Sequence, residues 1–158
     1  MSFYKPAEDS FFLSEIAKKY IKKNSKVLDM GTGSGIQSKN LIKFGVDKKN
    51  ILAVDISRDA LKQAEKLGVK ALESDLFDKL KGKFDLILFN PPYLPEDKFD
   101  KEKDTTGGKK GDEIILKFID QLNKYLSDNG VCLLLTSSLT PVNRWKKLTK
   151  EKNLNVKK

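Results

Sequence analysis

The sequence predicts an α/β fold with a mainly parallel sheet, and three observations support this prediction. Short apolar segments alternate with longer amphipathic segments, which is the pattern of strands followed by helices. The first expected strand leads through a glycine-rich loop into a helix. Four expected strands carry Asp or Asn at or near their carboxyl ends, the edge at which such sheets bind ligands. We therefore expect a ligand site along this edge.

Length and composition restrict the classes of protein that fit. The chain has 158 residues, of which 39% are hydrophobic and 34% charged, so we expect one domain over residues 1–158 with a full core. No apolar run approaches the roughly 18 residues of a membrane span, and no signal peptide opens the chain. Cys132 is the only cysteine, which favours a reducing, cytoplasmic location. Because histidine is absent, we expect neither a His/Cys zinc site nor a His-based nucleophilic triad.

The formal net charge of +9 is concentrated at the end of the chain, where residues 141–158 hold seven basic residues and one acid. A basic end can bind a polyanion such as RNA. A solvated lysine-rich surface is the simpler interpretation, because only Trp145 places an aromatic ring among these lysines.

The first expected helix covers residues 6–22, within an N-terminal segment of residues 1–24. It opens on a proline followed by two acids, which suit a first helical turn. Apolar residues at helical spacing predict one buried face, and Phe11 and Phe12 are expected in the core. Ser10 is expected at the surface or as a capping residue.

The next segment has the pattern that starts a nucleotide-binding unit. It consists of a strand over residues 26–30, the loop Gly31-Thr32-Gly33-Ser34-Gly35 and a helix near 36–44. Glycines let the backbone approach a ligand closely. Asp29 lies two residues before the loop, where its carboxylate would repel a pyrophosphate but attract the ammonium group of an amino-acid-like ligand. This favours S-adenosylmethionine over NAD.

Two further strands end in acids. The strand over residues 51–56 carries Asp55, whose carboxylate could accept both hydroxyls of a ribose, and Ser57 is the better candidate to cap the helix at 58–67. The strand over 70–75 ends at Asp75, which could take the exocyclic amine of adenine, with Leu76 against the ring. Parallel strands would place Asp29, Asp55 and Asp75 on one rim.

The fourth strand, residues 84–90, runs into Asn90-Pro91-Pro92-Tyr93. The two prolines stop the strand because they cannot donate backbone hydrogen bonds. The Asn90 amide oxygen and the Pro91 carbonyl could each accept one N–H of a planar NH2 group, and Tyr93 could stack on its face. Taken alone, the stretch could equally be a strand that ends in a tight turn.

The remaining segments are less informative. Residues 94–111 show no periodicity, and we expect a flexible loop beside Asn90 that binds substrate. A helix over 112–127 is expected to end at Gly130, followed by a fully buried strand over 131–137 that includes Cys132. A last helix is expected over 142–152.

The sequence resembles the class I S-adenosylmethionine-dependent methyltransferases. More narrowly, it resembles the HemK-like family that methylates the glutamine of the Gly-Gly-Gln motif in translation release factors. The matching segments are residues 4–13, 29–35, 53–56 and 90–93. The first of them is similar to the short archaeal and eukaryotic branch, which lacks the bacterial N-terminal helical domain. The Asn-Pro-Pro-Tyr motif by itself is shared with DNA adenine and ribosomal RNA guanine methyltransferases.

The resemblance implies a Rossmann-like three-layer sandwich and a set of site residues. Asp29, Gly31 and Gly33 would hold the methionine moiety of S-adenosylmethionine, and S-adenosylhomocysteine would be the product. The remaining cofactor contacts would come from Ser10 in the N-terminal helix and from Asp55, Ile56, Asp75, Leu76 and Asn90. Asn90, Pro91 and Tyr93 would form the catalytic pocket for the glutamine side chain. A small zinc-binding activator subunit serves the eukaryotic branch.

The chain departs from the family pattern at its end. The family sheet has seven strands, and the last two form an antiparallel hairpin beside the fifth. This hairpin is apparently missing here, so we expect the strand near 131–137 to form an edge, with a risk of self-association.

Three alternative functions are open at this point. An N-methyltransferase acting on adenine N6 or guanine N2 of RNA or DNA would use the same acceptor pair, although no recognition module for nucleic acid is visible. A cofactor-binding subunit without activity would have no use for the Asn90–Tyr93 stretch. Protein lysine methylation fits an amide-gripping pocket less well.

Overall fold

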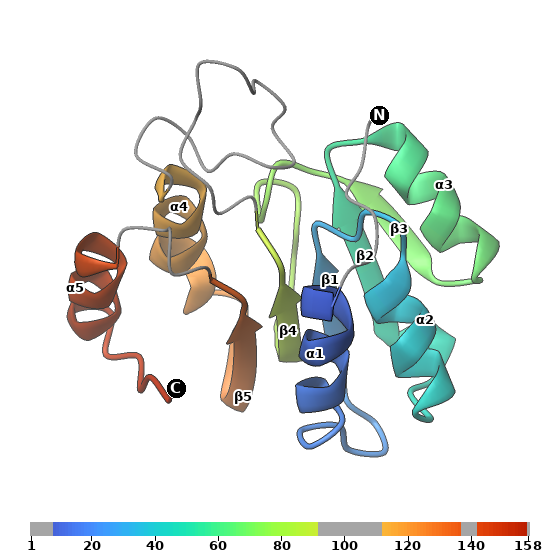
Figure 1. The fold of residues 1–158 in the computed structure, drawn as a ribbon, viewed down its shortest axis with the longest axis horizontal. Coiled ribbons are helices and arrows are strands. Elements are labelled where there is room, and N and C mark those ends of the chain that lie inside the picture. Colours follow the sequence, from blue (N-terminus) through green and yellow to red (C-terminus); the bar gives the residue numbers. More distant parts are fainter. Residues whose placement is uncertain (1–7, 92–111, 137–141, 158) are drawn as a thin grey trace. The chain divides into compact units, whose positions relative to one another are not determined.

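The structure is a computed structural model, and it describes residues 8–91, 112–136 and 142–157. Helices and strands alternate over most of this length, as the sequence pattern predicts (Figure 1). In chain order the elements are α1 (Glu8–Ala17), β1 (Val27–Met30), α2 (Ile36–Lys43), a 3-10 turn (Lys48–Asn50), β2 (Ile51–Asp55), α3 (Arg58–Lys66), β3 (Lys70–Glu73), β4 (Phe84–Phe89), α4 (Glu113–Leu122), β5 (Leu126–Leu134) and α5 (Asn143–Glu151).

The elements belong to two compact units. The first unit contains residues up to Asn90 together with Tyr125–Leu135, and it holds α1, α2, α3 and the strands. The second unit comprises Pro91–Lys124 and Thr136–Lys158, and it holds α4 and α5.

Within the described residues, the strands form one five-stranded sheet in the order β3-β2-β1-β4-β5. Every neighbouring pair is parallel. All four residues of β1, the central strand, are buried, which is the usual state of a strand inside a parallel sheet. The predicted α/β fold with a mainly parallel sheet is confirmed.

One apolar cluster of the first unit lies on the face of the sheet that α1, α2 and α3 cover. Alternate residues of the central strands, among them Val27, Ile51 and Leu86, are almost fully buried there. They cluster with apolar residues of α1, α2 and α3, namely Leu13, Ala17, Leu41 and Ala64. Side chains alternate between the faces of a strand, so this packing fixes which strand residues face the three helices.

Helix α1 buries Leu13 and Ala17, as its apolar pattern predicts, but serines and not phenylalanines complete the buried face. Phe11 and Phe12, expected in the core, are 52% and 58% exposed. Ser10, expected at the surface, is only 2% exposed, and Ser14 is buried as well. The reason is that Ser14 donates a 2.6 Å hydrogen bond to Oε1 of Gln37 on α2, so a polar contact orients the helix.

Strand β5 begins earlier than predicted, and helix α4 ends earlier. Gly130 therefore lies inside the strand and does not end the helix. The register slips between Phe84 and Leu86, with Asn129 at a positive φ of 63°, which is the signature of a bulge. Ser127, in the early part of β5, donates a 2.7 Å hydrogen bond to Oδ1 of Asp85 on β4. The first half of β5 therefore pairs irregularly with β4 and contains additional residues, which the spacing of apolar residues does not reveal.

The prediction that this strand is fully buried was also wrong. The apolar residues of β5, Cys132 included, are only partly buried. The physical reason is their position, because within the described residues β5 is the last strand on its side of the sheet. The edge position itself agrees with the prediction.

Candidate cofactor-binding site

The register of the sheet brings three predicted site residues to one level. Met30 at the end of β1 pairs with Val54 of β2 on one side and with Phe89 of β4 on the other. The residues that follow these three are Gly31, Asp55 and Asn90. They leave three neighbouring strands at the same point, with the glycine loop in the middle.

The glycine loop has the backbone conformation that requires glycine. Gly31, Gly33 and Gly35 have φ values of 66°, 53° and 83°. A Cβ atom on Gly31 would lie 3.4 Å from the ring of Phe89. Because Gly31 is exposed and carries no side chain, the main chain of the loop is accessible to a ligand at the end of β1.

Asp29 is 1% exposed and is tied into the loop through a single oxygen. Its Oδ2 accepts hydrogen bonds from Thr32 Oγ1 (2.8 Å), Ser38 Oγ (2.7 Å) and Ser38 N (3.2 Å). The described residues place no hydrogen bond on the other oxygen, Oδ1. Burial raises the pKa of this carboxyl, and the charge of Asp55 raises it further, whereas the hydrogen bonds from Ser38 and Thr32 lower it.

This state of Asp29 fits a cationic ligand. A buried carboxylate with an oxygen lacking a donor gains from a nearby ammonium or sulfonium group, which S-adenosylmethionine carries. A pyrophosphate would instead meet negative charge at this position. The donor set of the site therefore agrees with the predicted class of cofactor.

Asp55, at the end of β2, accepts hydrogen bonds from the glycine loop and from the residue that caps α3. Its Oδ2 accepts from Gly33 N at 3.0 Å, and its Oδ1 accepts from Ser57 N at 2.9 Å. Ile56, next in the chain, is 53% exposed and adds an apolar surface beside the carboxylate. Ser57 caps α3 by accepting from Ala60 N at 3.3 Å, as predicted.

The turn after β3 stays close to Asp55. Ser74 N donates to the Asp55 carbonyl at 3.1 Å, and the Ser74 hydroxyl donates to the Leu76 carbonyl at 2.9 Å. Leu76 is buried and takes a positive φ of 54°, which is uncommon for leucine, while Asp75 is exposed. Ser74 thus links the turn that carries Asp75 and Leu76 to the end of β2.

The catalytic residues predicted after β4 are described only in part. Asn90 is half-buried directly after the strand, and Pro91 is buried. Tyr93 and the loop predicted over residues 94–111 lie outside the described residues.

Sequence reasoning missed the contact that holds Ser10. The Ser10 carbonyl accepts a 2.8 Å hydrogen bond from Nε2 of Gln37, which lies in the first turn of α2 just after the glycine loop. Ser10 is thereby tied to the loop that carries Gly31 and Gly33. The available signal was the pair Ser10 and Ser14, which lie one helical turn apart on the same face as Leu13 and Ala17.

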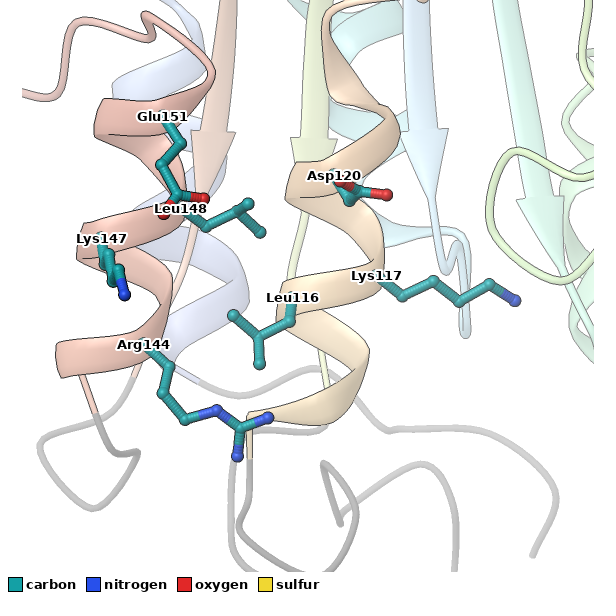
Figure 2. Close-up of a pocket in the computed structure, with 7 residues that line it drawn as sticks. All are labelled: Leu116, Lys117, Asp120, Arg144, Lys147, Leu148 and Glu151. Carbon is teal, nitrogen blue, oxygen red and sulfur yellow. The ribbon is translucent and has the colours of Figure 1, made fainter.

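A separate hollow lies in the second unit, between α4 and α5 (Figure 2). Leu116 and Leu148 extend toward one another across it, and charged side chains surround them. The lining residues are Leu116, Lys117, Asp120, Arg144, Lys147, Leu148 and Glu151, none of which is a predicted site residue. Two of the charges already have partners, since Asp120 pairs with Lys152 at 3.0 Å and Arg144 with Asp112 at 3.3 Å.

Two features are absent from the part of the chain that the structure describes. No three His, Cys, Asp or Glu side chains there are grouped so that they could hold a metal ion. The helices in the same part of the chain are too short or too polar to cross a membrane.

A parallel sheet in this order, with a glycine loop after the central strand and acids after the next two, defines the class I methyltransferase fold. The chain matches the methyltransferase small domain family over residues 8–154. It is 43% identical over 148 residues to a Methanocaldococcus jannaschii protein named "Putative protein N5-glutamine methyltransferase", covering 87% of this chain and 73% of that protein. The chain therefore belongs to the methyltransferase small domain family, among its HemK-like glutamine methyltransferases.

Two further relatives agree with this assignment. Methyltransferase HEMK2 of Mus musculus is 30% identical over 151 residues, covering 84% of this chain and 71% of that protein. The solved E. cuniculi Mtq2-Trm112 complex, described as responsible for methylating the translation termination factor eRF1, matches with a TM-score of 0.74 and 26% identity. That match covers 97% of this chain and 85% of the solved one. The chain spans less than half the length of the bacterial glutamine methyltransferases of Francisella tularensis and Lactococcus lactis.

Proposed function

We propose that the chain transfers a methyl group from S-adenosylmethionine to N5 of the glutamine in the Gly-Gly-Gln motif of a class I translation release factor. The observation that carries the proposal is the shared level of Gly31, Asp55 and Asn90 at the ends of three adjacent strands. It sets a site suited to a cationic cofactor beside a strand end suited to holding an amide. The named functions of the relatives support the same reaction and substrate class.

Different residues of the chain would contact different parts of the cofactor. The Asp29 carboxylate, which accepts no hydrogen bond on Oδ1 from the described residues, attracts the ammonium group of the methionine moiety. The exposed Gly31 gives that moiety access to the main chain, while Gly33 is buried and donates its N–H to Asp55. Asp55 accepts the ribose hydroxyls. Four other residues contact the adenine end or close over the cofactor, namely Ile56, Asp75, Leu76 and Ser10.

S-adenosylmethionine, when bound, supplies a methyl group made electrophilic by its sulfonium. The task left to the protein is to hold a poorly nucleophilic amide nitrogen in line with that methyl group. Asn90 Oδ1 and the Pro91 carbonyl each accept one N–H of the glutamine side chain, and Tyr93 flanks its plane. Two fixed acceptors orient the nitrogen and stabilise the positive charge that develops on it, so no strong general base is required.

We also propose that a small zinc-binding activator subunit assists the enzyme. The support is the solved Mtq2 structure, which contains Trm112 as a partner. Co-expression with the corresponding subunit of the source organism should raise soluble yield and the affinity for S-adenosylmethionine. Identical yield and affinity with and without the subunit would remove this part of the proposal.

The substrate is tested by methyl transfer from radiolabelled S-adenosylmethionine. The protein is incubated with the cognate class I release factor, with the same factor in which the glutamine of Gly-Gly-Gln is replaced by asparagine, and with total RNA. Label in the first sample alone is the expected result. Label in RNA and not in the release factor would instead assign the enzyme to nucleic-acid amino groups.

A further inference from the structure

The interface between α1 and α2 contains a buried polar cluster where packed helices usually present apolar side chains. Ser10, Ser14 and Gln37 are 2%, 3% and 6% exposed. Gln37 Nε2 donates to the Ser10 carbonyl at 2.8 Å, and the Ser14 hydroxyl lies 2.6 Å from Gln37 Oε1. One glutamine side chain thus contacts α1 at two points, one helical turn apart.

The available hydrogens fix the orientation of the Gln37 amide. The Ser14 hydroxyl has one hydrogen and two neighbouring acceptors, Gln37 Oε1 at 2.6 Å and the Ser10 carbonyl at 3.2 Å, so the shorter contact takes it. Asn40 Nδ2 donates to the oxygen of the same hydroxyl at 3.0 Å. The Gln37 NH2 must then face the Ser10 carbonyl, because the opposite orientation would turn the amide oxygen toward another acceptor.

Gln37 occupies a position that joins α1 to the candidate cofactor site. It is the second residue of α2, immediately after the glycine loop, and its neighbour Ser38 donates twice to Asp29. The first turn of α2 therefore holds the Asp29 carboxylate through Ser38 and the Ser10 main chain through Gln37. The loop and the N-terminal helix share one rigid support.

We propose that Gln37 is a positioning residue for cofactor binding: its amide holds the Ser10 main chain against the first turn of α2, which follows the glycine loop. The inference rests on the proposed function, because it assumes that Ser10 closes over S-adenosylmethionine. Gln37 touches neither the cofactor nor the substrate in this scheme. Its loss weakens cofactor binding and leaves the methyl-transfer step unchanged.

Two substitutions at Gln37 and one at Ser14 separate positioning from simple stability. Gln37→Met removes both hydrogen bonds at nearly constant shape. Gln37→Glu keeps an acceptor for Ser14 but turns a carboxylate oxygen toward the Ser10 carbonyl. Ser14→Ala is the matched comparison, because it removes the bonds of the hydroxyl to Gln37 Oε1 and Asn40 Nδ2 and leaves the Gln37–Ser10 bond in place.

The primary measurement is the calorimetric Kd for S-adenosylhomocysteine, made on variants whose circular dichroism shows a native fold, with KM and kcat for methyl transfer alongside. We expect both Gln37 variants to weaken binding about tenfold, the scale of one buried hydrogen bond, and to raise KM with kcat within about twofold of wild type. Ser14→Ala should lower the melting temperature and leave the Kd within about twofold of wild type, because the bond to Ser10 remains.

Three outcomes would overturn the inference. Unchanged Kd in both Gln37 variants would assign the amide a purely structural role. An equal loss of affinity in Ser14→Ala would mean that any loosening of α1 weakens binding. Absence of binding by the wild-type protein would reject the proposed function, and the inference with it, so the two failures are distinguishable.

Discussion

Asn90 and Asp29 lie at the ends of neighbouring strands, yet their environments assign them different tasks. Asn90 is half-buried beyond the last residue of β4, whereas Asp29 is buried inside β1 under hydrogen bonds from the loop. The first can contact a substrate, and the second can act only on a ligand seated against the glycine loop.

Replacing Asn90 by alanine should lower kcat about a hundredfold and change the Kd for S-adenosylhomocysteine little, by analogy with the loss of one preorganised polar group. The reason is that Asn90 would act mainly on the amide in the transition state. Single-turnover methylation of the release factor and calorimetry measure the two quantities.

Asn50→Ala provides the control. Asn50 is also a half-buried asparagine, but it precedes β2 and so lies at the amino ends of the strands, opposite the candidate site. Its rates should match those of the wild type. Equal methylation rates for Asn90→Ala and wild type would show that the amide is not part of the catalytic pocket.

Replacing Asp29 by asparagine should weaken cofactor binding without lowering the stability of the fold at neutral pH. Burial raises the folded-state pKa of Asp29 above its ordinary value of 3.8. Its favourable contribution to folding is therefore complete below that value and is lost as the pH rises through the folded pKa.

Denaturant unfolding at a series of pH values checks this prediction. The free energy of unfolding of the wild type, taken relative to Asp29→Asn, should decline from about pH 4 upward and then level off. A difference that grows with pH would mean that the carboxylate is stabilised in the folded chain.

For single residues, the sequence was sufficient to predict candidate site residues at the ends of strands. It was not sufficient to predict residues whose role depends on hydrogen bonds between side chains. Asp29, Asp55 and Asn90 could be predicted because parallel strands must deliver their ends to one edge. Gln37 could not, because its importance depends on two side-chain bonds to a helix 23 and 27 residues earlier in the chain.

Among the elements, the glycine loop shows most clearly how main-chain geometry and ligand access coincide. Gly31→Ala should reduce stability by roughly 1–2 kcal/mol, the cost of a left-handed conformation in an L-residue. The added methyl group would also lie against Phe89 and at the cofactor, so the Kd for S-adenosylhomocysteine should rise.

Gly82→Ala separates these two effects. Gly82 has a similar φ of 84° and precedes β4, so it lies at the amino ends of the strands, away from the candidate site. An added Cβ atom there would have nothing within 4 Å. Thermal melting should show comparable losses for both variants, while calorimetry should show weaker binding for Gly31→Ala alone. Wild-type affinity in Gly31→Ala would place the cofactor away from this glycine.

The elements that the sequence predicted well are those whose boundaries have strong local signals. The capping serine and the periodic apolar residues of α3 fixed that helix to within one residue. Helix α1 and strand β5 departed from prediction because a polar network and a bulge decide their orientation and register. Neither cause shows in the spacing of the apolar residues.

For the whole molecule, the two edges of the described sheet differ in protection. At the β3 edge Lys70 is exposed and Glu73 is paired with Arg58 at 3.0 Å. The β5 edge is longer and partly exposed. Its first half carries the exposed Asp128 and Asn129, but residues 131–134 form an uncharged apolar run. Charged edges resist pairing with a second chain, whereas long apolar edges invite it.

We therefore expect the chain to associate as its concentration rises, with β5 as the contact. Light scattering should show a mass that increases with concentration, and Leu134→Lys should reduce this increase while circular dichroism remains native. A monomer at all concentrations would contradict the prediction, and equal association of the variant would place the contact elsewhere.

The register that assembles the site also dictates when the site can form. Gly31 and Asn90 become neighbours only through the pairing of β1 with β4, which joins Met30 to Phe89 across a long stretch of chain. Pairings of such sequence separation form slowly and late in folding. During synthesis, the glycine loop and both acids emerge well before β4 does. We therefore expect the nascent chain to complete the β1–β2 part of the site, which would hold the methyl donor, before it gains the catalytic amide in a later step.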